Sequence, residues 1–290
     1  MIPYFALRID VETATGLMLG LPSMLRILAS RGVRATVMMP MGPDRSGLAL
    51  ARIIGKPHRL RQMLRLRPAG ASIVSAFMAG IAVPVRSMAA AARVARPMVF
   101  GHELALHGHD HWLWIHRCRA WPLERVDLEV RRGQAAFAAA LGERAKAFAA
   151  PGWIVTPETL AAVDKAGFLY ASDCRGSTPF LPDGMHTPQL PVTLPTAEET
   201  VRAGQSLKIL TNRVAREVTC REYSCYCAHA EVEGLRFPDL LSRLLDIVQA
   251  VARVGTLSDA MALQASLPVC PVVQIPLAGR FDTVASQGVA

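Results

Sequence analysis

Short runs of apolar and β-branched residues alternate with longer amphipathic segments along most of this 290-residue chain. Such alternation is typical of an α/β protein with a parallel sheet, because each helix carries the chain back to the start of the next strand. A barrel and a doubly wound sheet both fit this pattern, and seven strands suit a single barrel. The predicted strands cover residues 4–10, 34–39, 103–107, 145–149, 168–172, 190–192 and 223–228. The predicted helices cover residues 23–30, 123–141, 157–166 and 237–254.

Local signals mark the ends of several predicted helices. Thr156 followed by Pro157 is a capping residue followed by a first-turn proline. Gly142 and Gly255 are suitable helix stops, because glycine tolerates the left-handed backbone that often ends a helix.

The composition is that of a globular protein. With 51% hydrophobic and 19% charged residues, the chain can bury a sizeable core. The disordered, collagen-like, low-complexity and disulfide-rich classes are excluded by these values and by only six cysteines. These cysteines show no C-x-x-C spacing, so they are expected to be buried thiols in a reducing compartment. Residues 4–10 lack the features of a secretory signal, which favours a cytoplasmic protein.

The basic charge is concentrated in one segment. Between Arg45 and His102 there is no Asp or Glu, and ten residues are Lys or Arg. Subtracting these ten from the total of +9 leaves −1 for the rest of the chain. They are Arg45, Arg52, Lys56, Arg59, Arg61, Arg65, Arg67, Arg86, Arg93 and Arg96. We call residues 45–100 the basic segment and expect a helical insertion between strands two and three of one catalytic domain covering residues 1–290.

The basic segment has the composition of a membrane-surface element. Its cations alternate with apolar residues, as in helices that lie at a lipid headgroup interface, and no acid balances them. Arg59, Arg61 and Arg65 are the predicted contacts with an anionic membrane. The apolar stretch at residues 71–85 is shorter than the roughly 20 residues needed to span a bilayer. The alternative is a helical hairpin that packs on the barrel with a solvated basic face.

Three clusters of potential metal ligands follow predicted strands, where parallel α/β folds collect functional groups. Asp10 and Glu12 end the first strand and share one face of it. His107 and His111 follow the third strand, and a helical turn after Gly108 would place them one turn apart, a spacing that suits a divalent ion. His229 ends the last predicted strand and could act as a general acid in hydrolysis.

These clusters, in this order, resemble the polysaccharide deacetylase (NodB-homology) superfamily, whose members are metal-dependent hydrolases built on a distorted (β/α) barrel. The resemblance is closest to the deformylases of 4-deoxy-4-formamido-L-arabinose linked to undecaprenyl phosphate. The matching strings are RIDVET at 8–13, GPD at 42–44, LHGHDH at 106–111, SDCRG at 172–176, PVTLPT at 191–196 and HAEVEG at 229–234.

The resemblance implies an enzyme of lipid A modification and cationic peptide resistance, associated with the cytoplasmic face of the inner membrane. It would release formate and a 4-amino sugar lipid. By residue, it implies Asp10 as the catalytic base and His229 as the general acid. It implies a divalent ion, whether zinc, manganese or cobalt, held by Glu12, His107 and His111.

The chain departs from the family pattern at two positions. The family usually has Asp at the position of Glu12, so the longer side chain shifts the carboxylate by about 1.5 Å and could alter metal preference. An arginine of the superfamily is replaced by Ala149, so the orientation of the base must come from another residue. Trp153 would provide an aromatic wall, and Asp173 and Arg175 would position the substrate, with Arg175 suited to the lipid phosphate. The alternatives are ordinary packing of Trp153 at the barrel rim and a structural pair of Asp173 with Arg175.

Two other functions stay open from the sequence. One is a deacetylase of another lipid-linked or polymeric N-acylated amino sugar, since the same residues would serve it. The other is a catalytically inactive lipid-binding barrel. Nucleic-acid binding is not expected, because it would leave the histidine cluster without a role.

Overall fold

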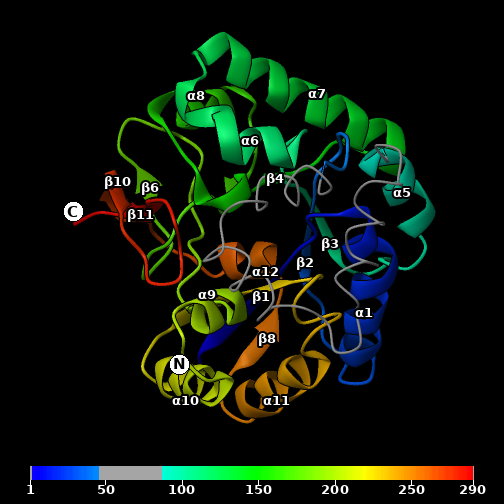
Figure 1. The fold of residues 1–290 in the computed structure, drawn as a ribbon. Helices are drawn as coiled ribbons and strands as arrows, with labels where there is room; N and C mark the ends of the chain where they lie inside the picture. Colours follow the sequence, from blue (N-terminus) through cyan, green and yellow to red (C-terminus); the bar gives the residue numbers. More distant parts are fainter. Residues whose placement is uncertain (1, 46–86, 290) are drawn as a thin grey trace.

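The structure is a computed structural model that describes residues 2–45 and 87–289. Its main element is a parallel sheet of seven strands, in the order β5-β4-β3-β2-β1-β7 with β8 also paired to β1. The strands are β1 (Tyr4–Asp10), β2 (Thr36–Met39), β3 (Glu103–Leu106), β4 (Ala147–Phe148), β5 (Tyr170–Ala171), β7 (Tyr223–His229) and β8 (Arg253–Gly255). This curled half-barrel confirms the expected α/β barrel fold (Figure 1).

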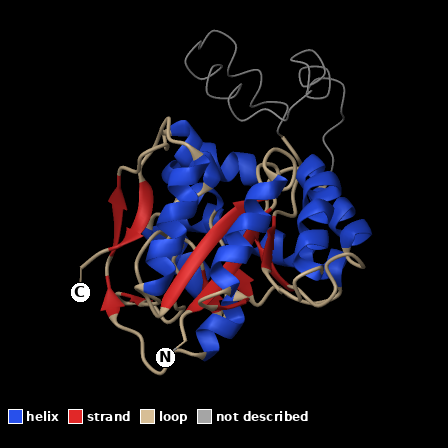
Figure 2. Cartoon of the chain, turned by 90° about the horizontal axis from the view of Figure 1, so that it is seen from below, coloured by secondary structure: helices blue, strands red, loops and turns tan. Residues whose placement is uncertain are grey.

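Helices surround the sheet on its outer side, as the two views show (Figures 1 and 2). The longer helices are α1 (Leu21–Ala29), α5 (Met88–Ala95), α7 (Leu123–Leu141), α8 (Pro157–Lys165), α10 (Leu207–Thr219) and α11 (Pro238–Gln249). The shorter ones are the π-helix η1 (Gly16–Gly20), α6 (His111–Arg117), η2 (Cys118–Ala120), η3 (Pro151–Trp153), α9 (Ala197–Arg202) and α12 (Leu257–Ala262). Two small sheets, β6 (Leu181–Pro182) with β9 (Val269–Cys270) and β10 (Val272–Ile275) with β11 (Val284–Gln287), lie outside the main sheet.

The period-two alternation of β1 separates two apolar cores. Phe5, Leu7 and Ile9 belong to the core beneath the helices. Tyr4 and Ala6 belong to the core inside the half-barrel. Because side chains alternate between the faces of a strand, the even-numbered residues of β1 face the interior. The polar residues at positions 8 and 10 therefore enter the barrel interior, where the site is built.

The centre of the sheet is completed by a short strand. The first half of β1 pairs with β8, with Tyr4 opposite Arg253. Its second half pairs with β2, with Arg8 opposite Thr36. Along its whole length β1 also pairs with β7. All of β1 is buried as a result, as expected for a central strand of a parallel sheet.

Two of the three local helix signals are confirmed, and the third is wrong, because Gly255 is the last residue of the strand β8 and ends no helix. Thr156 caps α8 by accepting a hydrogen bond from the backbone N–H of Thr159. Gly142 ends α7 with φ of 86°, in the left-handed region. The six cysteines are free, and five of them are buried as expected, whereas Cys220 is exposed.

Two predicted elements are wrong in extent. Residues 190–192 form only an isolated bridge, between Val192 and Arg175, and no regular strand. The seventh strand is instead β8, in a region predicted to be the end of a helix at 237–254. The helix α11 ends at Gln249, and the chain turns at once into β8 because those residues pair with β1.

Most of the basic segment, including the predicted membrane contacts Arg59, Arg61 and Arg65, lies outside the described residues. Its described end contains α5, which packs against α7. The two described edges of the gap are close together, since Pro43 forms a bridge with Ser87. In the part of the chain that the structure describes, no helix is both long and apolar enough to cross a bilayer.

Candidate active site

The site lies at the carboxyl ends of β1, β3 and β7. Asp10 is the last residue of β1, and it is paired in register with His229, the last residue of β7. His107 directly follows β3, and its backbone N–H donates to the carbonyl of Met39 at the end of β2. The parallel sheet thus brings together residues that are far apart in the sequence, as the strand-end rule predicts.

Asp10 makes a two-point contact with an arginine on its own strand. The Nε and one Nη of Arg8 donate to the two carboxylate oxygens at 2.6 and 2.7 Å. Burial alone would raise the pKa of Asp10, but the charge of Arg8 and the hydrogen bonds from it hold this pKa well below its usual range. Asp10 is therefore a carboxylate, as a general base must be.

His107 has a defined tautomer. Its Nδ1 lies 2.9 Å from the carbonyl oxygen of Ala149, so Nδ1 carries the proton and Nε2 keeps a free lone pair. Burial lowers the pKa of His107 to about 3, which makes the ring neutral. The 3.7 Å approach of Nε2 to Asp10 is consequently no ion pair. A neutral imidazole with one nitrogen held by a carbonyl is the usual state of a histidine that ligates a metal.

His111 and Glu12 lie beside His107. The rings of His107 and His111 are 5.1 Å apart. The expected helical turn between them is wrong, because α6 begins only at His111 and the chain turns at Gly108 with φ of 68°. The buried Nε2 of His111 has no hydrogen-bond partner and lies 3.5 Å from Glu12 Oε1. An unpaired imidazole nitrogen beside a carboxylate fits a cation site, so Glu12, His107 and His111 could hold a divalent metal.

His229 also lies close to Glu12. Its Nε2 is 3.9 Å from Glu12 Oε1, and its buried Nδ1 has no hydrogen-bond partner. Burial would lower the pKa of His229, but the negative charges of Glu12, Glu198 and Asp10 outweigh it and raise this pKa. A histidine with a raised pKa is suited to give a proton to a leaving group.

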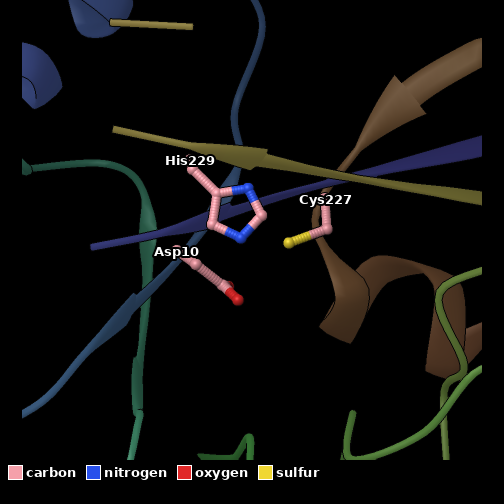
Figure 3. Close-up of side chains that lie close together, drawn as sticks. All are labelled: Asp10, Cys227 and His229. Carbon is pink, nitrogen blue, oxygen red and sulfur yellow. The ribbon is translucent and has the colours of Figure 1, made fainter. Parts of the chain in front are cut away.

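A second set of potential ligands is more compact but less suited to a metal. Figure 3 shows Asp10, Cys227 and His229 pointing toward one another, with their ligand atoms within 4.8 Å. Both carboxylate oxygens of Asp10 already accept from Arg8, whose positive charge would repel a cation. Burial also raises the pKa of Cys227 well above its usual value, so the thiol stays protonated.

The three predicted substrate residues, Trp153, Asp173 and Arg175, are all buried, and each has different contacts. Asp173 is buried and accepts hydrogen bonds from the backbone N–H of Ala150 and from Gln189. Trp153 is buried edge-on to His229, with ring centroids 6.5 Å apart, and has a rare positive φ of 55°. Arg175 is buried, stacks on Trp153 at 5.1 Å and donates to the carbonyl of Leu194.

Two residues with clear positions in the site had no role in the sequence analysis. One is Arg8, whose only signal is a charged residue inside an otherwise apolar strand, two positions before Asp10. The other is Glu231, which accepts hydrogen bonds from the backbone N–H groups of Glu12 and Thr13. Glu231 therefore holds the loop that presents Glu12 to the site.

A pocket opens next to the ligand set. It has a volume of about 280 Å³. Its lining residues are Glu12, Thr13, Pro40, Pro43, Asp44, Arg45, Met88, His111, Trp112, Ile115 and His116. Glu12 and His111 thus connect the candidate site residues to a mainly apolar cavity. A larger pocket of about 530 Å³ between α10 and α11 contains none of the site residues.

The chain is similar to known proteins over most of its length. The chain is 32% identical over 247 residues to a probable 4-deoxy-4-formamido-L-arabinose-phosphoundecaprenol deformylase of Shewanella sediminis, covering 84% of this chain and 80% of that protein. A protein of the same name from Wigglesworthia glossinidia brevipalpis is 28% identical, with coverage of 80% and 83%.

A solved structure shows the same fold. The crystal structure of a protein classed as a polysaccharide deacetylase from Mycobacterium smegmatis matches with a TM-score of 0.63 at 14% identity, covering 95% of this chain and 94% of that one. The sequence model of the polysaccharide deacetylase family matches residues 20–171. Together with the curated relative at 32% identity, this match shows that the chain belongs to the polysaccharide deacetylase family of hydrolases.

Proposed function

We propose that this protein is a metal-dependent hydrolase that removes the formyl group from 4-deoxy-4-formamido-L-arabinose linked to undecaprenyl phosphate. The observation that carries the proposal is the register of a buried carboxylate, Asp10, with a histidine of raised pKa, His229, whose Nε2 lies 3.9 Å from Glu12. The two curated relatives, which bear the name of this activity, support the choice of substrate.

Glu12, His107 and His111 would hold the divalent ion. Two imidazoles and one carboxylate suit zinc, manganese or cobalt, and the donor set does not select among them. When bound, the ion supplies Lewis acidity toward the acyl carbonyl and makes a water molecule more acidic. The neutral state and fixed tautomer of His107 leave its Nε2 free for this role.

Asp10 and His229 would move the protons. Asp10 takes a proton from the attacking water, whose oxygen forms a bond to the formyl carbon. His229 then donates its proton to the sugar nitrogen as the C–N bond breaks, so that formate and a free amine leave. Because a carboxylate with a low pKa is a weak base, Asp10 depends on a water made acidic at the site.

The pocket between Glu12 and Trp112 offers room for the part of the substrate that continues beyond the amide. Its apolar walls, Pro43, Met88 and Ile115 among them, suit an aliphatic chain, and Arg45 at its edge suits a phosphate. Arg175 and Trp153, which lie against each other, would contact the sugar, and Asp173 would hold the backbone at Ala150 that leads to Trp153.

We also propose that the protein works at the cytoplasmic face of the inner membrane. The segment that contains Arg59, Arg61 and Arg65 leaves and rejoins the described fold at Arg45 and Ser87, and Arg45 lines the pocket. A basic segment at this position would bring the site to the anionic surface that carries the lipid substrate.

The test is formate release from the formamido-arabinose lipid by purified protein, with and without added divalent ion. We expect release only with metal, and a loss of about 100-fold or more in His229→Ala, the usual size of a general-acid contribution. His107→Ala should abolish both metal binding and turnover, whereas Arg213→Ala on α10 should change neither.

Two outcomes would contradict the proposal. Release of acetate from an acetamido analogue with no formate from the formamido lipid would point to a deacetylase of another amino sugar. Lipid binding that is unchanged by His107→Ala and His229→Ala, with no hydrolysis of either amide, would point to a barrel without catalytic activity.

A further inference from the structure

We propose that Arg8 is the positioning residue that holds Asp10 in the orientation needed for catalysis, an inference that rests on the base role of Asp10 in the proposed function. Arg8 meets both carboxylate oxygens of Asp10 with a two-point contact at 2.6 and 2.7 Å. Rotation of the Asp10 side chain would break both hydrogen bonds at once, which makes this contact more restrictive than any single bond.

Arg8 is itself fixed from the opposite side of the half-barrel. Its Nη1 donates to the backbone carbonyl and to the hydroxyl of Ser172, the latter at 3.0 Å. Ser172 follows β5 at the far end of the strand order, four strands away from β1. The hydroxyl of Ser172 donates to the carbonyl of Leu190, so the residue that holds Arg8 is itself held by the loop that contains Leu190.

The guanidinium of Arg8 has a third contact. It lies over the ring of Trp153, 5.7 Å from the centroid. The hydrogen bonds to Asp10 and Ser172 and the contact with Trp153 thus all restrain the side chain of Arg8. A lysine could keep the charge but could not reproduce the two-point contact or the stacking.

A purely stabilising role does not account for this pair. Arg8 and Asp10 are 1% and 2% exposed, and removing two charges from water costs more than a buried ion pair usually regains. The interior cluster on this face of the sheet is apolar, with residues such as Ala6 and Cys225, and an apolar pair would extend it at lower cost. Each carboxylate oxygen that accepts from Arg8 keeps a further lone pair, so Asp10 can still accept the proton of a water.

The experiment compares Arg8→Lys with Arg213→Lys, a matched change at another arginine–carboxylate pair, on the exposed side of α10. We expect Arg8→Lys to lower kcat by about 100-fold, the cost of misplacing a reacting group by about 1 Å, with KM nearly unchanged. Zinc affinity should stay at the wild-type value. A crystal structure of Arg8→Lys should show Asp10 in another rotamer while Glu12 and His107 keep their places.

Chemical rescue gives an independent readout. The kcat of Arg8→Ala should rise about tenfold when guanidinium ion is added. Ethylammonium at the same concentration should leave this kcat unchanged. If Arg8→Ala does not fold, Arg8→Lys still decides the question by its crystal structure.

An unmoved Asp10 in the Arg8→Lys crystal structure would overturn the inference, whatever the activity, and so would a wild-type kcat. A wild-type protein that hydrolyses no formamide would refute the proposed function. The displacement of Asp10 in Arg8→Lys would then still confirm that Arg8 orients this carboxylate.

Discussion

At the scale of single residues, a chain of hydrogen bonds through the backbone connects His107 to the buried acid Asp173. Its Nδ1 donates to the carbonyl of Ala149, and the next residue, Ala150, donates its N–H to Asp173 at 2.6 Å. Gln189 donates to the second oxygen of Asp173 at 3.1 Å. Asp173 therefore influences the site through the backbone that orients His107.

The pKa of Asp173 leads to a prediction about stability. Burial raises this pKa to about 6 from its usual 3.8, although hydrogen bonds from Gln189 and Ala150 oppose the shift. Because the folded pKa is above the unfolded one, the stabilising contribution is complete below pH 3.8 and is lost as the pH rises through 6. Between about pH 5 and about pH 7.5 the loss is about 1 kcal/mol.

Urea unfolding of the wild type and of Asp173→Asn across this pH range measures that loss. Between these two pH values the free energy of unfolding should fall by about 1 kcal/mol more in the wild type than in Asp173→Asn. The reason is that the asparagine side chain of the variant does not titrate. Equal slopes for the two proteins would show that Asp173 has an ordinary pKa.

Glu12 is the residue at which the metal proposal is most directly tested. Glu12→Gln keeps the shape of the side chain but removes the charge that lies 3.5 Å from His111. We expect zinc affinity to fall by about 100-fold or more in Glu12→Gln. Glu12→Asp should bind zinc within about tenfold of the wild type, since it restores a carboxylate on a shorter stem.

Equilibrium dialysis with metal analysis gives both affinities without an activity assay. Wild-type affinity in Glu12→Gln would place the metal elsewhere, for example at Asp10, Cys227 and His229. In that case Cys227→Ser would lower zinc affinity, a change that the proposed ligand set does not predict.

At the scale of secondary structure elements, the site depends on how closely η1 and α1 approach the loop after β7. Gly20 has a helical φ of −72°, and a Cβ there would lie 2.0 Å from the carbonyl oxygen of Ala230. In an ordinary helix, alanine is favoured over glycine by about 1 kcal/mol. At Gly20 the clash of a Cβ with the backbone of Ala230 should reverse this preference, so that alanine is less stable than glycine.

We therefore expect Gly20→Ala to lower the free energy of unfolding by about 1–3 kcal/mol and to reduce activity by displacing the loop beside His229. Gly32→Ala is the control, since its Cβ would meet nothing within 4 Å and only the positive φ of 62° opposes it. Urea denaturation measures both variants. A stabilised Gly20→Ala would show that the approach of α1 to this loop is not tight.

The elements also show what local sequence can and cannot predict. The start of α8 at Thr156 and the end of α7 at Gly142 were predictable, because capping depends on neighbouring residues alone. The strand β8 was not, because its three residues become a strand only by pairing with β1. The strand-end clusters at Asp10, His107 and His229 were predictable from the rule that parallel strands end at one edge.

The contact between Arg8 and Ser172 was beyond prediction for the same reason as β8. It depends on the curl of the sheet, which brings the end of β5 across the interior toward β1. A charged residue in an apolar strand signals that a buried partner exists, but it does not show where that partner lies. The role of Glu231 behind Glu12 likewise needs the tertiary structure.

At the scale of the whole molecule, charge and chemistry are divided between two parts of the chain. The acid-free segment between Arg45 and His102 contributes +10, and the rest has a net charge of −1. Attraction to an anionic surface should therefore depend on this segment and not on the half-barrel. Each Lys or Arg near such a surface contributes about 1 kcal/mol, and salt weakens the attraction by screening.

This division predicts how the full chain binds to vesicles. Changing Arg59, Arg61 and Arg65 together to Glu should lower the affinity for vesicles that contain phosphatidylglycerol by about 100-fold or more, since three favourable charges become unfavourable. Changing Arg213, Arg216 and Arg243 to Glu makes the same alteration of net charge on α10 and α11 and should have little effect. Co-sedimentation at low and high salt measures both. Equal losses in the two variants would mean that net charge alone drives binding, and the basic segment would then have no special part in reaching the lipid substrate.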